Sequence, residues 1–237
     1  MAVGVVDVAW AHPHRSKRLM GMLTDIERAR LASLRSADER DRFVAGHALL
    51  RHVVAECWSL VPAAVALTFT CARCGGPHGR PVAVPPEGRP PVHLSLAHAG
   101  DRVLVAASPA GPVGVDVEVV AGAAFAGFDD VALDPQERAR LAQVAPADAA
   151  AGRARVWVRK ESVLKATGDG LTRDPRLVVV SPPFDRPRVL AWPEDRSPSV
   201  ARLTDLEVGP GYAACLTLIT EHPARVRVHD ADDWLRG

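Results

Sequence analysis

An internal repeat constrains the fold of this chain more than any other feature of its sequence. The hexapeptide Glu-Arg-Ala-Arg-Leu-Ala stands at 27–32 and again at 137–142, and Val-Gly-Val stands at 3–5 and again at 113–115. Both matches have an offset of 110 positions, and they occur in the same order in the two places. Matches that share an order and an offset indicate two similar halves.

The boundary between the halves is predicted at the turn-forming segment Pro109–Pro112. We therefore expect an α+β pseudo-dimer with an N-terminal half, 1–111, and a C-terminal half, 112–237. A slightly larger offset of 114 extends the match, placing Phe43, Leu49, Leu50 and Arg51 over Trp157, Val163, Leu164 and Lys165.

The two halves differ in the charged residues at matched positions. Where the second half has Glu161 and Lys165, the first half has His47 and Arg51. The acidic groups thus belong to one half and the first half supplies basic groups. We expect one active site at the junction and a monomeric protein.

Short sequence signals predict where several elements begin. Three helices are predicted to begin at Thr24, Ser36 and Asp134, because each of these capping residues is followed three positions later by a Glu. The alternating apolar segments 103–107 and 113–119 predict the two strands of a hairpin, and 212–219 predicts a late strand. The Pro-rich segment 182–199 predicts loops with at most one short strand.

The chain composition excludes some classes of protein. With 237 residues, of which 48% are hydrophobic, the chain can bury a sizeable core. Its 29 basic and 28 acidic residues give a net charge of +1, so no overall field favours nucleic acid or a membrane surface. The absence of a membrane-length apolar run and of a signal-like start, with four cysteines, predicts a cytoplasmic protein with reduced thiols.

A helix is predicted over the stretch that starts at Trp157 and ends at two glycines, Gly168 and Gly170. Trp157, Glu161 and Lys165 lie one above another on a 3.6-residue turn. A carboxylate and an amine one turn apart suit proton transfer and phosphate binding. The alternative is a solvated Glu–Lys pair, which is common on helix surfaces.

A strand with two acidic residues on one face is predicted over 113–119. Asp116 and Glu118 share a face because side chains alternate along a strand. Carboxylate oxygens so placed suit Mg²⁺, which takes a few carboxylates and completes its shell with water and substrate phosphate. An ordinary half-exposed strand is the alternative when this pattern stands alone.

Together these two segments resemble the motifs of the Sfp-type 4′-phosphopantetheinyl transferases. The pattern Trp-x-x-Lys-Glu-x-x-x-Lys-x-x-Gly-x-Gly-Leu is met throughout 157–171, and Gly-(Val/Ile)-Asp-(Val/Ile)-Glu is met at 114–118. The resemblance implies transfer of the phosphopantetheine arm of coenzyme A to a carrier-protein serine, giving holo-carrier protein and adenosine 3′,5′-bisphosphate. It also implies a pseudo-dimer with coenzyme A in the cleft between the halves.

The resemblance assigns roles to residues of both motifs. Asp116, Glu118 and Glu161 are expected to hold Mg²⁺ against the pyrophosphate. Glu161 would accept the proton of the carrier serine, directly or through a water, and Lys165 would neutralise the departing bisphosphate. Lys160 would assist with phosphate charge.

Further contacts to coenzyme A are implied in the first half. The segment 95–100 is similar to the family's Asn-(Leu/Ile)-Ser-His-Ser-Gly, but Ser95 and Ala97 depart from it, so only a backbone N–H could serve at Ala97. His98 is retained as a phosphate contact. Four arginines match basic positions that face the nucleotide in the family: Arg28, Arg30, Arg42 and Arg80. The alternative for Arg28 and Arg30 is a pair of solvated charges on a helix.

Cys71 and Cys74 form a Cys-x-x-Cys pair that is followed by His78. Such thiolates can bind Zn²⁺, but no second pair follows, and a tetrahedral site would need a distant ligand such as His93 or Cys57. The sequence favours two ordinary thiols in a turn.

Two other functions stay open from the residues alone. The same carboxylates could activate water in a nucleotide pyrophosphatase, or the chain could be a non-enzymatic coenzyme A-binding or zinc-knuckle adaptor. For the transferase, the partner is an acyl, peptidyl or polyketide carrier protein, with polyketide and nonribosomal-peptide secondary metabolism among the pathways it could serve.

Overall fold

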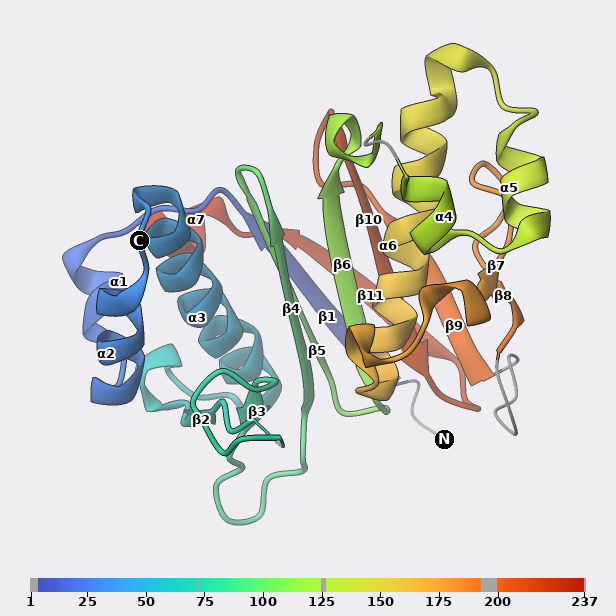
Figure 1. Cartoon of the computed structure of the whole chain (residues 1–237). Helices are drawn as coiled ribbons and strands as arrows, with labels where there is room; N and C mark the ends of the chain where they lie inside the picture. Colours follow the sequence, from blue (N-terminus) through green and yellow to red (C-terminus); the bar gives the residue numbers. More distant parts are fainter. Residues whose placement is uncertain (1–3, 72, 125–126, 193–199, 237) are drawn as a thin grey trace. The chain divides into compact units, whose positions relative to one another are not determined.

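A computed structural model describes residues 4–71, 73–124, 127–192 and 200–236 of the chain. The chain divides into two units: Met1–Gly111 with His222–Gly237 form unit 1, and Pro112–Glu221 form unit 2. Each unit combines its own helices with largely antiparallel sheets, which confirms the predicted α+β class (Figure 1). In the part of the chain that the structure describes, no helix is both long enough and apolar enough to cross a bilayer.

A four-stranded sheet with the strand order β11-β1-β5-β4 is the centre of unit 1. Its strands are β1 (Gly4–Ala11), β4 (His93–Ala99), β5 (Arg102–Ser108) and β11 (Ala224–Asp230). β11 pairs parallel with β1, and the other neighbours are antiparallel. The smaller elements of the unit are α1 (Lys17–Gly21), α2 (Asp25–Ser33), β2 (Leu67–Thr68), β3 (Val82–Ala83) and α7 (Asp232–Arg236).

The long helix α3 (Ala37–Trp58) packs on this sheet (Figure 1). It begins at a capping box in which Ser36 and Glu39 exchange side-chain to backbone hydrogen bonds, as its sequence predicts. Leu49, Leu50 and Val53 are fully buried in one apolar core with residues of β5. The helix predicted to open at Ser36 is confirmed, and it contributes much of the core of unit 1.

Unit 2 is built on a three-stranded antiparallel sheet with the order β6-β10-β9. Its strands are β6 (Val113–Val119), β9 (Ala201–Leu206) and β10 (Tyr212–Ile219), and the long helix α6 (Ala149–Thr167) packs on β6 and β10. The remaining elements are α4 (Phe128–Ala132), α5 (Pro135–Leu141), and the paired short strands β7 (Val179–Val180) and β8 (Val189–Ala191).

The two units, each taken by itself, follow the same order of elements. In unit 1, β1 pairs antiparallel with β5, the second strand of the β4–β5 hairpin. In unit 2, β6 pairs antiparallel with β10, the second strand of the β9–β10 hairpin. The repeated hexapeptide lies in α2 and α5, and a capping box opens both helices, with Glu27 or Glu137 as the acidic partner. The sequence repeat therefore corresponds to a repeated local structure.

Two expectations from the sequence are wrong. The segments 103–107 and 113–119 are strands, but they are not a hairpin: β5 pairs with β1 and β4, whereas β6 pairs with β10. The C-terminal residues 222–237 do not join the second half, because β11 extends the sheet of unit 1. Both errors arise because strand pairing is a long-range property that local alternation does not contain.

The late strand expected at 212–219 is confirmed as β10. The described residues of the Pro-rich segment 182–199 form loops and one short strand, β8, which pairs with β7 just before the segment. Residues 193–199 lie outside the described residues.

Candidate active site

A close approach of backbone to backbone positions the candidate site of unit 2. A Cβ atom added to Gly114 of β6 would lie 2.0 Å from the carbonyl oxygen of Ser162 and 2.4 Å from the backbone nitrogen of Ala166. Only glycine leaves room for the strand to lie against α6 at this point. The Gly114 face of β6 also carries Asp116 and Glu118, so those carboxylates lie against the helix.

Helix α6 presents the predicted face to this strand. The Nζ atom of Lys165 lies 2.6 Å from Oδ1 of Asp116, and the indole N–H of Trp157 donates a hydrogen bond to Glu118. Glu161 lies between them on the same helix face and is buried. The helix ends at Gly168, whose φ of 81° is in the left-handed region that favours glycine.

The structure therefore brings together the four residues that the sequence analysis placed at the reaction centre. They are Asp116, Glu118, Glu161 and Lys165. The alternative of a solvated Glu–Lys pair does not describe this helix, because Glu161 is only 7% exposed and Lys165 pairs with Asp116 rather than with Glu161.

Burial raises the pKa of each of the three carboxyl groups in the cluster. Burial raises the pKa of Asp116, although Lys165 acts in the opposite direction. Burial and then the charge of Asp116 raise the pKa of Glu118, and the same two causes raise the pKa of Glu161 to about 7. Such shifts mean that the ionised cluster would be stabilised by a proton or by a further cation.

Two buried oxygens of the cluster fit a metal ion. Oδ2 of Asp116 and Oε1 of Glu161 have no hydrogen-bond partner in the described part of the protein. Unpaired buried carboxylate oxygens are costly, and hard oxygen donors are the ligands that Mg²⁺ takes. In the described residues, ligand oxygens of Asp116, Glu118 and Glu161 do not all lie within 4.8 Å of one another. Mg–O distances of about 2.1 Å bring the oxygens bound to one ion to within about 4.2 Å of one another, so at least one of the three carboxylates would have to move or to bind through a water.

Lys160 does not fit the role that the resemblance implied. Its side chain is fully buried, and its Nζ atom lies 2.5 Å from Oε2 of Glu137 and 3.2 Å from the carbonyl oxygen of Pro175. Oε1 of Glu137 in turn accepts a hydrogen bond of 2.8 Å from the backbone N–H of Val180. In this structure Lys160 thus fastens α6 to α5 through Glu137.

Unit 1 contains a matching buried acid. Glu27, the repeat counterpart of Glu137, pairs with Nδ1 of His47 at 2.6 Å and with the guanidinium of Arg51 at 2.7 Å. The capping-box glutamate of the repeat therefore anchors the long helix in both units, through different basic partners. The repeat itself was the signal that could have revealed this role for Glu137.

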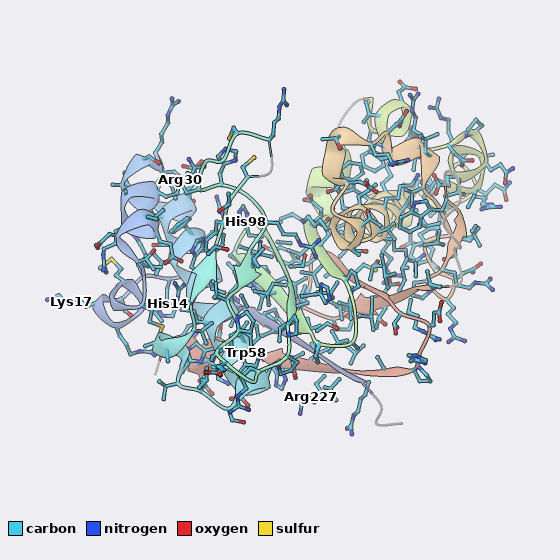
Figure 2. All side chains as sticks on the ribbon, turned by 90° about the horizontal axis from the view of Figure 1, so that it is seen from below. His14, Lys17, Arg30, Trp58, His98 and Arg227 are labelled. Carbon is cyan, nitrogen blue, oxygen red and sulfur yellow. The ribbon has the colours of Figure 1, made fainter. Side chains whose placement is uncertain are left out.

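The other predicted coenzyme A contacts all belong to unit 1. Arg28 and Arg30 lie on α2, and Figure 2 shows Arg30 projecting from that helix. A side-chain N–H of Arg28 lies 3.1 Å from the carbonyl oxygen of Met20. Arg42, on α3, donates a hydrogen bond of 3.0 Å to the carbonyl oxygen of Gly100.

Three further contacts were predicted near β4. Ala97 is buried in the strand, and His98, labelled in Figure 2, is the next residue and is exposed. Arg80 donates from Nε to the carbonyl oxygen of Leu94 at 3.2 Å. These positions do not test the coenzyme A contacts expected of the six residues in unit 1, so those contacts stay predictions.

The sequence reasoning missed the role of Gly114. A glycine within a strand pattern is a known signal of close backbone approach, and here it brings β6 and α6 together. It is a positioning residue for the carboxylates that follow it.

This α+β unit, with carboxylates of a strand facing a Glu and a Lys of one long helix, defines a candidate phosphate-handling domain. Residues 112–217 match the family model described as the 4′-phosphopantetheinyl transferase superfamily. The segment that contains both motifs is therefore similar to this superfamily, in agreement with the family prediction from those motifs.

Curated relatives agree with this assignment. A putative 4′-phosphopantetheinyl transferase of Synechocystis sp. is 27% identical over 64% of this chain and 59% of its own length. The 4′-phosphopantetheinyl transferase AcpT of Escherichia coli O157:H7 is 29% identical over 54% and 58%, respectively. The 4′-phosphopantetheinyl transferase psf-1 of Bacillus pumilus is 27% identical over 76% of both chains. The chain thus spans less than two thirds of the length of the first two of these relatives.

Proposed function

We propose that this protein transfers the 4′-phosphopantetheine arm of coenzyme A to a serine of an apo carrier protein. The observation that carries the proposal is the cluster of Asp116, Glu118, Glu161 and Lys165, which unites both family motifs at one place. The names of the relatives support the same activity. The products would be holo-carrier protein and adenosine 3′,5′-bisphosphate.

The carboxylates would hold Mg²⁺. Asp116, Glu118 and Glu161 supply hard oxygen donors, two of which have no other partner in the described structure. When bound, the ion would neutralise the charge of the coenzyme A pyrophosphate and orient it for displacement. Burial, the largest cause of the raised pKa values of all three groups, makes their ionised forms costly without a bound cation and so supports this role.

Glu161 would act as the general base. Its carboxylate lies on the same helix face as Lys165 and is buried beside Asp116, so it is the candidate proton acceptor of the cluster, directly or through a water. It would take the proton of the carrier serine as the serine oxygen bonds to the phosphorus that carries the pantetheine arm. The bond from that phosphorus to the bridging pyrophosphate oxygen breaks, and the bisphosphate leaves with its electron pair.

Lys165 would neutralise the leaving bisphosphate. Its ammonium group lies beside the cluster, 2.6 Å from Asp116, and its side chain is 28% exposed, so it can also face a bound phosphate. Stabilisation of developing charge by a positioned cation is the largest contribution to catalysis in phosphoryl-type displacement.

We also propose the finer architecture that the repeat implies. The two units would form a pseudo-dimer within one monomeric chain, with coenzyme A in the cleft between them. Arg28, Arg30, Arg42, Arg80, His98 and the backbone at Ala97 would then contact the nucleotide. The equal order of strands in the two units supports the internal duplication on which this proposal rests.

The test is transfer of a fluorescent pantetheine from a coenzyme A analogue to an apo carrier protein. The expected result is Mg²⁺-dependent labelling that is lost in excess EDTA and in Asp116→Asn. Asp130→Asn serves as the matched control, because Asp130 is a 74% exposed carboxylate of the same unit. Hydrolysis of coenzyme A without a carrier would support a pyrophosphatase instead, and labelling that persists in excess EDTA would exclude the metal.

A further inference from the structure

A hairpin loop in unit 1 brings three soft metal-ligand atoms together. The loop joins β2 to β3 and contains Cys71, Cys74 and His78 (Figure 1). One ligand atom from each of the three residues lies within 4.8 Å of the other two. Among the described residues, no other group of three or more His, Cys, Asp or Glu side chains comes this close together. Sγ of Cys74 lies 3.0 Å from Nε2 of His78.

Backbone hydrogen bonds build the loop around these ligands. The N–H of Cys71 donates to the carbonyl oxygen of Gly76 at 2.8 Å, and the N–H of Gly75 donates back to the carbonyl oxygen of Cys71 at 2.8 Å. Gly75 has a φ of +71°, in the left-handed region that favours glycine. This turn folds Cys74 back over Cys71, so the proximity of the two thiols follows from the main chain.

The base of the loop is closed as tightly as its tip. The N–H of Gly79 donates to the carbonyl oxygen of Phe69 at 2.6 Å, and a Cβ atom on Gly79 would lie 2.2 Å from the carbonyl oxygen of Thr70. The ring of Phe69 stacks on buried His47 with 4.3 Å between centroids. The loop is therefore anchored in the core of unit 1 on one side and presents its ligands toward solvent on the other.

The local polar groups favour a thiolate at Cys71. The backbone N–H groups of Arg73 and Cys74 donate hydrogen bonds to its sulfur. Amide donors around a cysteine sulfur favour the negative charge that a metal ligand carries. His78 adds a neutral nitrogen donor, so the three atoms form the S, S, N set that Zn²⁺ prefers and Mg²⁺ does not.

We propose that Cys71, Cys74 and His78 bind one Zn²⁺ ion. The ligands belong to unit 1, whereas the carboxylate cluster belongs to unit 2. Metal–ligand bonds of about 2.0–2.3 Å place tetrahedral ligand atoms about 3.5–4 Å apart, so a small opening of the Cys74–His78 contact accommodates the ion. Because the described residues supply three ligands, a water or an exogenous donor occupies the fourth position.

The consequence for the protein is a rigid loop. The ion would cross-link residues 71 and 78 across the turn and so fix the chain immediately before Arg80, whose Nε atom donates to the carbonyl oxygen of Leu94 on β4. Because two of the three ligand residues are exposed, a strong chelator in solution can reach the ion.

The test is metal content of the full chain purified without chelator, followed by replacement of zinc with Co²⁺. We expect one zinc per chain, and a Co²⁺ form with thiolate charge-transfer absorption and the intense visible bands of a tetrahedral ion. Cys74→Ser and His78→Ala should each lose the metal and the tetrahedral spectrum. Cys57→Ser, a half-buried thiol on α3, is the matched control and should keep both.

Two further measurements make the result decisive. Circular dichroism shows whether each variant is folded, and the wild-type Co²⁺ spectrum tests the site without any substitution. Asp116→Asn should retain zinc while it loses carrier labelling, so the zinc site and the proposed activity can fail independently. A zinc-free wild type with no thiolate–cobalt band, a Cys71–Cys74 disulfide in the freshly purified protein, or full zinc content in Cys74→Ser would overturn the proposal.

Discussion

Replacement of Glu161 by Gln should make the metal-free protein more stable at alkaline pH. Glu161 is 7% exposed, and burial followed by the charge of Asp116 raises its pKa from 4.5 to about 7. Between these two values the folded protein retains a proton that the unfolded chain has released. The free energy of unfolding therefore falls as pH rises through this window and levels off above about 7.

The magnitude follows from the pKa. At about 1.36 kcal/mol per pH unit, a rise from 4.5 to about 7 corresponds to a loss of about 3 kcal/mol at alkaline pH. Gln has nearly the same shape and carries no charge, so Glu161→Gln removes this loss. The variant should match the wild type at about pH 5 and exceed it by up to about 3 kcal/mol at about pH 8.5.

Urea unfolding in excess EDTA at the two pH values measures this difference. Glu207→Gln is the control, because Glu207 is an exposed carboxylate of the same unit and its replacement should leave the pH dependence unchanged. Saturating Mg²⁺ should stabilise the wild type at alkaline pH, by about 2.7 kcal/mol at one hundred times the dissociation constant, and should stabilise Glu161→Gln less. Equal pH dependence of the wild type and Glu161→Gln would refute the assignment of buried charge to Glu161.

Three further predictions concern the elements around the cluster. Gly114→Ala should destabilise the protein by about 3 kcal/mol or more, because its Cβ would overlap the backbone of Ser162, and thermal unfolding measures the loss. Lys160→Met should lower stability by about 3–5 kcal/mol by leaving Glu137 buried without its partner, and the double variant Lys160→Met, Glu137→Gln should regain much of this in the same assay. Lys165→Ala should lower kcat by about 10²–10³ while coenzyme A still binds; an increase in KM alone would make Lys165 a ground-state binding residue.

Local sequence patterns predicted much of the candidate site. Trp157, Glu161 and Lys165 share a helix face because 3.6 residues make one turn, and Asp116 and Glu118 share a strand face because side chains alternate. Capping boxes fixed the beginnings of α2, α3 and α5. These features depend on neighbours in the chain, so the sequence is sufficient to determine them.

Other properties of the protein appeared only with the tertiary structure. Lys160 and Glu161 are adjacent and both polar, yet Lys160 pairs with Glu137 while Glu161 faces Asp116. Whether a charge is structural or reactive depends on which distant group is buried beside it, and burial is decided by packing.

The sequence by itself thus determined the family motifs, the repeat and the spacing of the candidate catalytic groups, since all three are local or periodic. Only the tertiary structure decided that β11 pairs with β1, and that Gly114 lets β6 lie against α6. It also brought a ring nitrogen of His78 within 4.8 Å of the sulfur atoms of Cys71 and Cys74. The physical reason is that strand pairing, burial and ligand convergence depend on where the chain returns in space, which no local pattern of residues specifies.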